Sequence, residues 1–117
     1  MSVLFARGSV VYVEGVLDEF GKNPKTRQVV FVADFEDSHD AALAVAITSE
    51  FRQPLKADEI LLPFHRNGGC GSGLTLQSVA VCRWTVFALK QDIREKTGHI
   101  PNRQMLAILE RVEARMQ

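Results

Sequence analysis

The sequence contains little cysteine and no excess charge of either sign. Cys70 and Cys82 are too few and too far apart for a zinc cluster or a disulfide framework, which favours a reducing cytoplasm. Fourteen basic and fourteen acidic side chains cancel, so a polyanion would have to bind a local patch. No hydrophobic stretch is long enough to cross a membrane, and the opening MSVLFARG lacks a signal-peptide cleavage pattern. We therefore expect a cytoplasmic protein that neither spans nor binds a membrane.

Internal repeats and low-complexity segments are also absent from the 117 residues. A chain of this length buries roughly two thirds of its unfolded surface, which is enough for one hydrophobic core. We expect a single domain over residues 1–117.

Two short apolar runs organise the middle of the chain. Residues 28–33 (QVVFVA) and 42–47 (ALAVAI) contain β-branched side chains and are separated by the polar run EDSHD. They predict two neighbouring strands buried on both faces. Because Arg27 precedes the first run and Thr48 follows the second, antiparallel pairing would place both at the same rim of the sheet.

Three further segments favour β-structure. Residues 9–14 (SVVYVE) predict a first strand, residues 59–63 (EILLP) a short strand ended by proline, and residues 74–89 one bent strand or two. Residues 15–26 contain two glycines and a proline and predict a mobile loop of about twelve residues leading to Arg27, a length that favours a functional role. Trp84 and Phe87 are more typical of a core or an interface than of a base-stacking platform.

Residues 65–73 (HRNGGCGSG) contain four glycines in nine residues. Such a run could form a phosphate-binding nest, but it lacks the Gly-Lys-Ser/Thr ending of a P-loop, and a flexible hairpin connection is the simpler interpretation. Cys70 near His65 would suit a cysteine nucleophile only with an orienting partner, which the sequence does not supply.

The C-terminal segment predicts one amphipathic helix. Its apolar residues recur at helical spacing, Pro101 discourages extension upstream, and Asn102 can cap the helix. Short strands followed by a single helix favour a mainly β fold, a small, strongly curved antiparallel sheet with the helix packed on it. The apolar face consists of Met105, Ile108, Leu109, Val112 and Met116.

The order of these segments resembles the MazF/PemK (also Kid) toxins of bacterial type II toxin-antitoxin modules. The resemblance covers roughly residues 6–115, and its most specific part is an Ala-Ile-Thr-Ser block preceded by an arginine that opens an apolar strand. The matching pieces are Arg7-Gly8, Arg27-Gln28-Val29-Val30, Val45-Ala46-Ile47-Thr48-Ser49, Ser78-Val79 and the closing helix.

This resemblance implies an SH3-like barrel that forms a homodimer and cuts single-stranded RNA at short sequence motifs without a metal or other cofactor. It also implies a cognate antitoxin whose disordered acidic tail occupies the RNA groove. By position, Arg27 matches the catalytic arginine of the family and Thr48 its catalytic threonine. Residues that we expect to contact RNA are Glu19, Lys22, Lys25, Ser49, Arg52, His65 and Arg83.

The residue types suit this chemistry. In RNA the 2'-hydroxyl can attack the adjacent phosphorus, so an enzyme has mainly to position the chain and stabilise charge in the transition state. The guanidinium of Arg27 offers a bidentate fork to phosphate oxygens. The hydroxyl of Thr48 can hold a non-bridging oxygen or orient the attacking group.

The sequence departs from the family pattern at three points. Gln28 replaces a proline, Arg83 and Trp84 replace an acidic residue and a glutamine, and residues 15–26 contain no histidine. Arg83 removes a candidate base but adds positive charge near a phosphate. Activity could therefore depend on Arg27 and Thr48 alone, be weakened, or be lost.

Two other classes of protein remain open. The first is a non-catalytic toxin of the same barrel that poisons DNA gyrase, as the related CcdB proteins do. The second is a degenerate SH3-like interaction module. Exposed apolar side chains among Val79, Trp84 and Phe87 would be consistent with a dimer in any of these classes.

Overall fold

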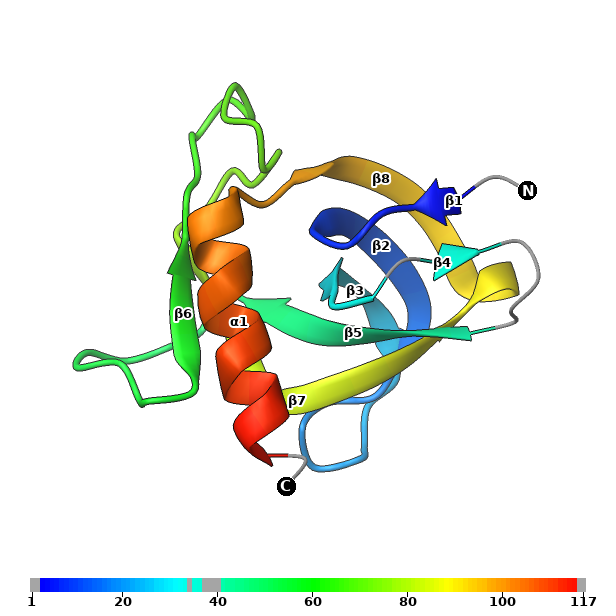
Figure 1. Ribbon diagram of the computed structural model, residues 1–117, viewed down its shortest axis with the longest axis horizontal. Helices are drawn as coiled ribbons and strands as arrows, with labels where there is room; N and C mark the ends of the chain where they lie inside the picture. Colours follow the sequence, from blue (N-terminus) through cyan, green and yellow to red (C-terminus); the bar gives the residue numbers. More distant parts are fainter. Residues whose placement is uncertain (1–2, 34, 37–40, 116–117) are drawn as a thin grey trace.

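A computed structural model describes residues 3–33, 35–36 and 41–115. It contains a six-stranded antiparallel sheet in the order β6-β7-β5-β3-β2-β8, strongly curved, with one helix lying across it (Figure 1). Short strands β1 (Val3–Phe5) and β4 (Phe35–Glu36) form a separate pair. The large sheet consists of β2 (Ser9–Val16), β3 (Lys25–Phe31), β5 (Ala41–Thr48), β6 (Glu59–Leu62), β7 (Ser78–Leu89) and β8 (Ile93–His99).

The predicted central strands are confirmed as β3 and β5. They pair antiparallel, and both are buried on their two faces: Val29, Val30 and Phe31 of β3 and Ala44, Val45 and Ala46 of β5 are fully buried. The sheet therefore separates two apolar clusters. The predicted fold class, a mainly β domain with one C-terminal helix, is confirmed.

Helix α1 (Asn102–Arg115) covers one face of the sheet, next to β6 and β7 (Figure 1). Met105, Ile108 and Val112 are buried in the cluster on this face, and Leu109 packs against it. Met116, the last residue predicted for the apolar stripe, lies outside the described residues. The second cluster consists of Val11, Val13, Val16, Val29, Phe31, Ala42, Ala44 and Ala88.

The predicted loop of residues 15–26 was too long. Strand β2 continues to Val16 and β3 begins at Lys25, because Gly15, with φ of +75°, takes part in a register shift between Val13 and Val16 rather than ending the strand. The segment between them, residues 17–24, is called the strap below.

Strand β8 and the three-residue 3₁₀ helix η1 (Lys90–Asp92) were not predicted. The sequence of β8, IREKTGH, contains three consecutive charged and exposed residues, because this strand is an edge of the sheet and pairs only with β2 among the described residues. Charged side chains are common on edge strands, where they prevent pairing with other chains.

The glycine-rich run 65–73 is packed closely against β8 rather than free. Gly71 accepts a hydrogen bond from the His99 backbone N–H at 2.9 Å, and Gly73 lies directly against the Thr97 carbonyl. The buried Ser72 hydroxyl donates to the Pro63 carbonyl at 2.7 Å. These contacts make the run a packed connection between β6 and β7.

Strand β7 is one continuous strand, and its register with β5 is interrupted. β5 advances by one residue, from Val45 to Ala46, while its partner on β7 changes from Thr85 to Val81. Residues 82–84 therefore form a bulge.

Of the three apolar residues considered for a dimer surface, Val79 is buried and Phe87 is 72% exposed. None of the described helices is both long and apolar enough to cross a lipid bilayer.

Candidate functional site

Arg27 and Thr48 lie at the same end of the β3–β5 pair. Val29 pairs with Ala46 across these strands, and the same register continued by two residues places Arg27 opposite Thr48. Side chains alternate along a strand, so Arg27 and Thr48 extend from the same face as Val29. The antiparallel pairing brings two residues that are distant in sequence to one rim.

Both residues line a polar hollow of about 380 Å³. Lys25 and Ser49, two of the predicted RNA contacts, line it as well. Tyr12 was not predicted for the site, although its pairing with Gln28 on the neighbouring strand follows from the register of β2. The other lining residues are Thr26, Gln28, Ile47, Glu50, Leu74, Thr75, Leu76 and Ser78.

The hydroxyl of Thr48 keeps its proton available for a ligand. Its oxygen accepts a hydrogen bond from the Glu50 backbone N–H at 3.0 Å, which orders the chain where β5 ends. A hydroxyl that accepts one hydrogen bond can still donate one. Thr48 can therefore donate to an oxygen of a molecule bound in the hollow.

The guanidinium of Arg27 is held by backbone and by an aromatic ring. Its Nε–H donates to the Val16 carbonyl at 3.0 Å, and Nη2 donates to the Asn23 carbonyl at 2.9 Å. Its Cζ lies 5.3 Å from the centroid of the Trp84 ring, within the range of a cation–π contact. Arg27 is thus ordered although it is only half-buried.

The strap is ordered by Asp18. The Asp18 carboxylate accepts the backbone N–H groups of Phe20 and Lys22, each at 2.9 Å, and the side-chain amide of Asn23 at 2.9 Å. The hydrogen bond from the Lys22 backbone, followed by that from Asn23, lowers the pKa of Asp18 below its usual value. This turn positions the Asn23 carbonyl that Arg27 binds.

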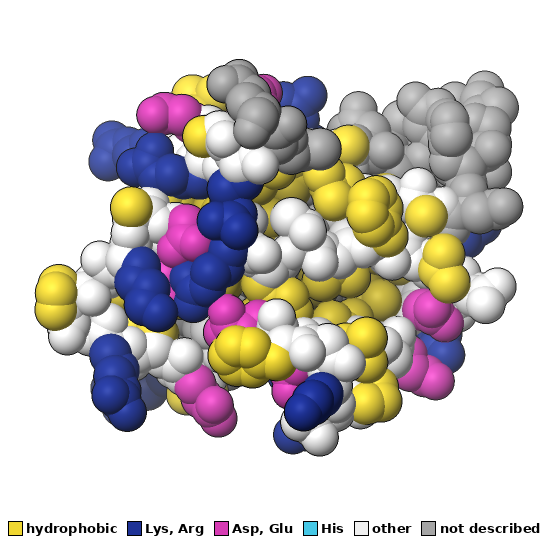
Figure 2. Space-filling model, turned by 90° about the horizontal axis from the view of Figure 1, so that it is seen from below, with side chains coloured by type: hydrophobic (Ala, Val, Ile, Leu, Met, Phe, Trp, Pro, Cys, Tyr) yellow, Lys and Arg dark blue, Asp and Glu magenta, His cyan; other side chains and the backbone are white. Residues whose placement is uncertain are grey.

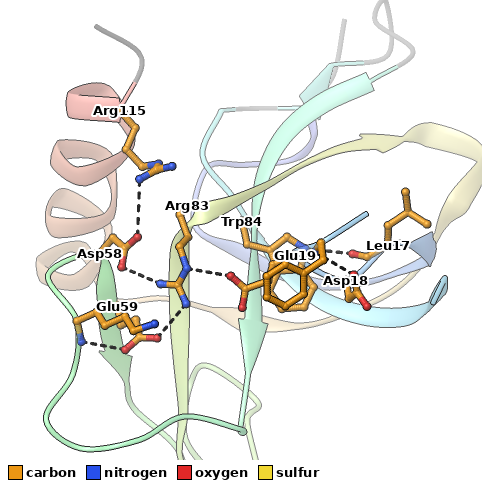
Figure 3. A network of polar contacts seen from close by, with 10 residues as sticks. Leu17, Asp18, Glu19, Asp58, Glu59, Arg83, Trp84 and Arg115 are labelled. Atoms are coloured by element: carbon orange, nitrogen blue, oxygen red, sulfur yellow. Dashed lines mark hydrogen bonds and ion pairs between the residues drawn. The ribbon is translucent and has the colours of Figure 1, made fainter. Parts of the chain in front are cut away.

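Arg83 lies outside the polar hollow, among three carboxylates (Figure 3). Its guanidinium contacts Glu19 at 2.9 Å, Asp58 at 2.8 Å and Glu59 at 3.4 Å. Burial alone would lower the pKa of Arg83, but these partners outweigh burial and raise it. Glu19 and Arg83, both predicted RNA contacts, are therefore paired with each other.

We expect Arg83→Met to lower the free energy of unfolding by about 2 kcal/mol, because it leaves three neighbouring carboxylates without their shared cation. Urea denaturation would measure the change. Arg94→Met is the matched control: Arg94 contacts Glu14 at 2.8 Å, both side chains are largely exposed, and the expected loss is below about 0.5 kcal/mol. Equal losses for the two variants would contradict a structural role for the Arg83 cluster.

The other predicted RNA contacts do not line the hollow. Lys22 belongs to the strap, Arg52 to the link between β5 and β6, and His65 to the glycine-rich run; all three are exposed, and none lines the hollow. Seen from below, the molecule has hydrophobic side chains across the middle of the face and Lys and Arg gathered toward one side (Figure 2).

Among the described residues no group of His, Cys, Asp or Glu side chains could hold a metal ion.

The two free cysteines differ in burial, since Cys82 is buried and Cys70 is partly exposed. Burial, followed by the nearby charge of Asp58, raises the pKa of Cys82 to about 11, whereas a hydrogen bond from the Ser72 backbone lowers the pKa of Cys70. At neutral pH the thiolate fraction of Cys70 should exceed that of Cys82, so iodoacetamide should modify Cys70 first. Peptide mass spectrometry of the native protein would measure this; equal labelling of both cysteines would contradict it.

The architecture defines a class: a small barrel-like antiparallel sheet closed by one C-terminal helix. No family model matches the sequence, and no curated protein matches it. Solved structures match the fold. They include MazF from Deinococcus radiodurans, with a TM-score of 0.73 and 15% identity over 99% of this chain and 98% of that one. Another is the Mycobacterium tuberculosis toxin MazF-mt6, with a TM-score of 0.62 and 19% identity over 91% of this chain and 95% of that one.

Solved complexes of a toxin with its antitoxin also match the fold of this chain. A mycobacterial endoribonuclease with its cognate antitoxin gives a TM-score of 0.66 and 13% identity, over 95% of this chain and 93% of that one. The chain therefore has the fold of the MazF toxins, and the resemblance noted in its sequence is confirmed at the level of the fold.

Proposed function

We propose that this chain is the toxin of a type II toxin-antitoxin module and a metal-independent endoribonuclease that cuts single-stranded messenger RNA at short sequence motifs. The observation that carries the proposal is the placement of Arg27 and Thr48 on adjacent strands, at one rim and in one polar hollow. The MazF-like fold supports the same function.

The proposed reaction uses the RNA's own 2'-hydroxyl. Its oxygen attacks the adjacent phosphorus and loses its proton, the bond from phosphorus to the 5'-oxygen breaks, and that oxygen gains a proton. The products are a 2',3'-cyclic phosphate and a 5'-hydroxyl. Arg27 stabilises the charge on the phosphorane-like transition state, and Thr48 donates to a non-bridging oxygen.

The charge around the hollow suits a phosphodiester. Lys25 and Arg27 are cations in its lining, opposed by the single carboxylate of Glu50. Since the chain has no net charge, this local arrangement has to attract the RNA backbone. Lys22 in the strap and Arg52 beyond β5 are proposed to extend the contact.

We also propose a homodimer and a cognate antitoxin with an acidic disordered tail. A MazE-MazF complex from Deinococcus radiodurans matches this fold with a TM-score of 0.69, which supports an antitoxin partner. An acidic tail would compete with RNA for Lys25 and Arg27. Phe87, exposed on β7, is available for a contact between two copies.

The test is incubation of the purified protein with a mixed RNA in excess EDTA. We expect discrete fragments with 5'-hydroxyl ends, no cleavage of an oligonucleotide whose riboses are 2'-deoxy, and slower cleavage by Thr48→Val. Intact RNA together with inhibition of gyrase supercoiling would instead indicate a gyrase poison. No effect in either assay would indicate an interaction module without chemistry.

A further inference from the structure

The bulge in β7 redirects Trp84 toward Arg27. Residues 82–84 fall between the pairs Val45–Thr85 and Ala46–Val81, so they leave the regular ladder. Bulges change where a side chain points and are frequent beside active sites. Here the bulge accompanies the placement of the indole ring 5.3 Å from the Arg27 guanidinium carbon.

The contacts of Arg27 leave part of its guanidinium free. Nε–H and one N–H of Nη2 bind the Val16 and Asn23 carbonyls, and Trp84 lies against the guanidinium. Among the described residues Nη1 has no hydrogen-bond partner. Since a guanidinium has five N–H donors, three remain without a partner among the described residues and can bind a ligand.

Trp84 is itself fixed to the strap. Its indole Nε1–H donates to the Leu17 carbonyl at 3.1 Å, and the neighbouring Arg83 binds Glu19 two residues further along (Figure 3). The strap is thus attached to β7 at two points and to Arg27 at a third, through the Asn23 carbonyl. A rotation of the Trp84 ring would break the contact with Leu17 and remove the surface against which Arg27 lies.

We propose that Trp84 is a positioning residue for Arg27, holding the guanidinium in one orientation before RNA binds. This inference rests on the proposed ribonuclease function. An arginine side chain that is already ordered loses less conformational freedom when it engages the transition state. Trp84 does not line the polar hollow, and the role proposed for it is to act through Arg27.

The experiment compares Trp84→Phe with Trp84→Met in cleavage assays on one RNA oligonucleotide. Phenylalanine keeps a ring face but has no N–H for Leu17, whereas methionine fills similar space without a ring. We expect Trp84→Met to lower kcat about 10- to 100-fold with KM within about threefold, and Trp84→Phe to keep kcat within about threefold. In an Arg27→Lys background, which lacks the planar fork, Trp84→Met should change kcat by less than about twofold.

A second measurement does not depend on cleavage. Trp84 is the only tryptophan of the chain, so all of the tryptophan fluorescence comes from the side chain that contacts Arg27. We expect Arg27→Ala to change the intensity or wavelength of emission, while Arg103→Ala, which alters an exposed cation on α1, leaves it unchanged. The fluorescence measurement does not use Trp84→Met, so it remains informative if that variant does not fold.

Several results would overturn the positioning role while the proposed function stands. These are an unchanged kcat in Trp84→Met, a loss of kcat in Trp84→Phe as large as that in Trp84→Met, or the full effect of Trp84→Met on kcat in the Arg27→Lys background. Emission that Arg27→Ala does not change would also overturn it. A wild-type protein that cuts no RNA would overturn the proposed function first, and the positioning role with it.

Discussion

We expect Arg27→Ala to lower kcat/KM for the proposed RNA cleavage by about 10³- to 10⁴-fold and to leave the protein folded. The variant removes the permanently charged fork that we assign to the transition state, and losses of this size are typical when the arginine that stabilises a transferring phosphoryl group is removed. Arg27→Lys keeps the charge but not the bidentate geometry, so it should lose about 10²-fold. Initial rates on a fluorogenic RNA oligonucleotide in EDTA would measure both variants.

The control for this prediction is Arg103→Ala. Arg103 is an exposed cation on α1 and does not line the polar hollow, so its loss tests whether any positive charge would matter. Thermal unfolding must accompany the assay, because Arg27→Ala also loses its contacts with Val16, Asn23 and Trp84. A folded Arg27→Ala protein that cuts at the wild-type rate would refute the assigned role.

Gly73→Ala lowers the free energy of unfolding by at least about 4 kcal/mol. Gly73 has φ of +73°, and a Cβ there would lie 2.0 Å from the carbonyl oxygen of Thr97. The clash is with backbone of β8, which cannot move aside as the end of a side chain can. Urea denaturation would measure the loss, and a variant that is unfolded in buffer would meet the expectation.

Gly71→Ala is the matched control from the same run. A Cβ at Gly71 has no neighbouring atom within 4 Å, and its φ is not in the left-handed region. The expected change is below about 1 kcal/mol, since only the greater flexibility of glycine in the unfolded chain is lost. Similar stability of the two variants would show that the run is not pressed against β8.

The central strands and the helix could be predicted because their signals are local. β-Branched runs around Val29 and Val45 indicate strands buried on both faces, and the spacing of Met105, Ile108 and Val112 indicates a helix. The shared rim of Arg27 and Thr48 followed from antiparallel pairing alone. These features need no knowledge of distant contacts.

The surroundings of Arg83 and Trp84 could not be predicted, because they depend on residues from separate segments. Glu19 comes from the strap, Asp58 directly precedes β6 and Glu59 begins it, and only the folded sheet brings them to β7. Strand β8 was missed for a different reason. An edge strand rich in charge lacks the alternating apolar pattern by which strands are identified.

The two apolar clusters on opposite faces of the sheet share their central strands. Val29 and Phe31 face one cluster while Val30 faces the other, so neither cluster can lose its packing without disturbing β3. Backbone amides in such a strand exchange with solvent only when the whole molecule opens. The strands that carry Arg27 and Thr48 should therefore exchange their backbone amides more slowly than the strap, whose residues are mostly exposed.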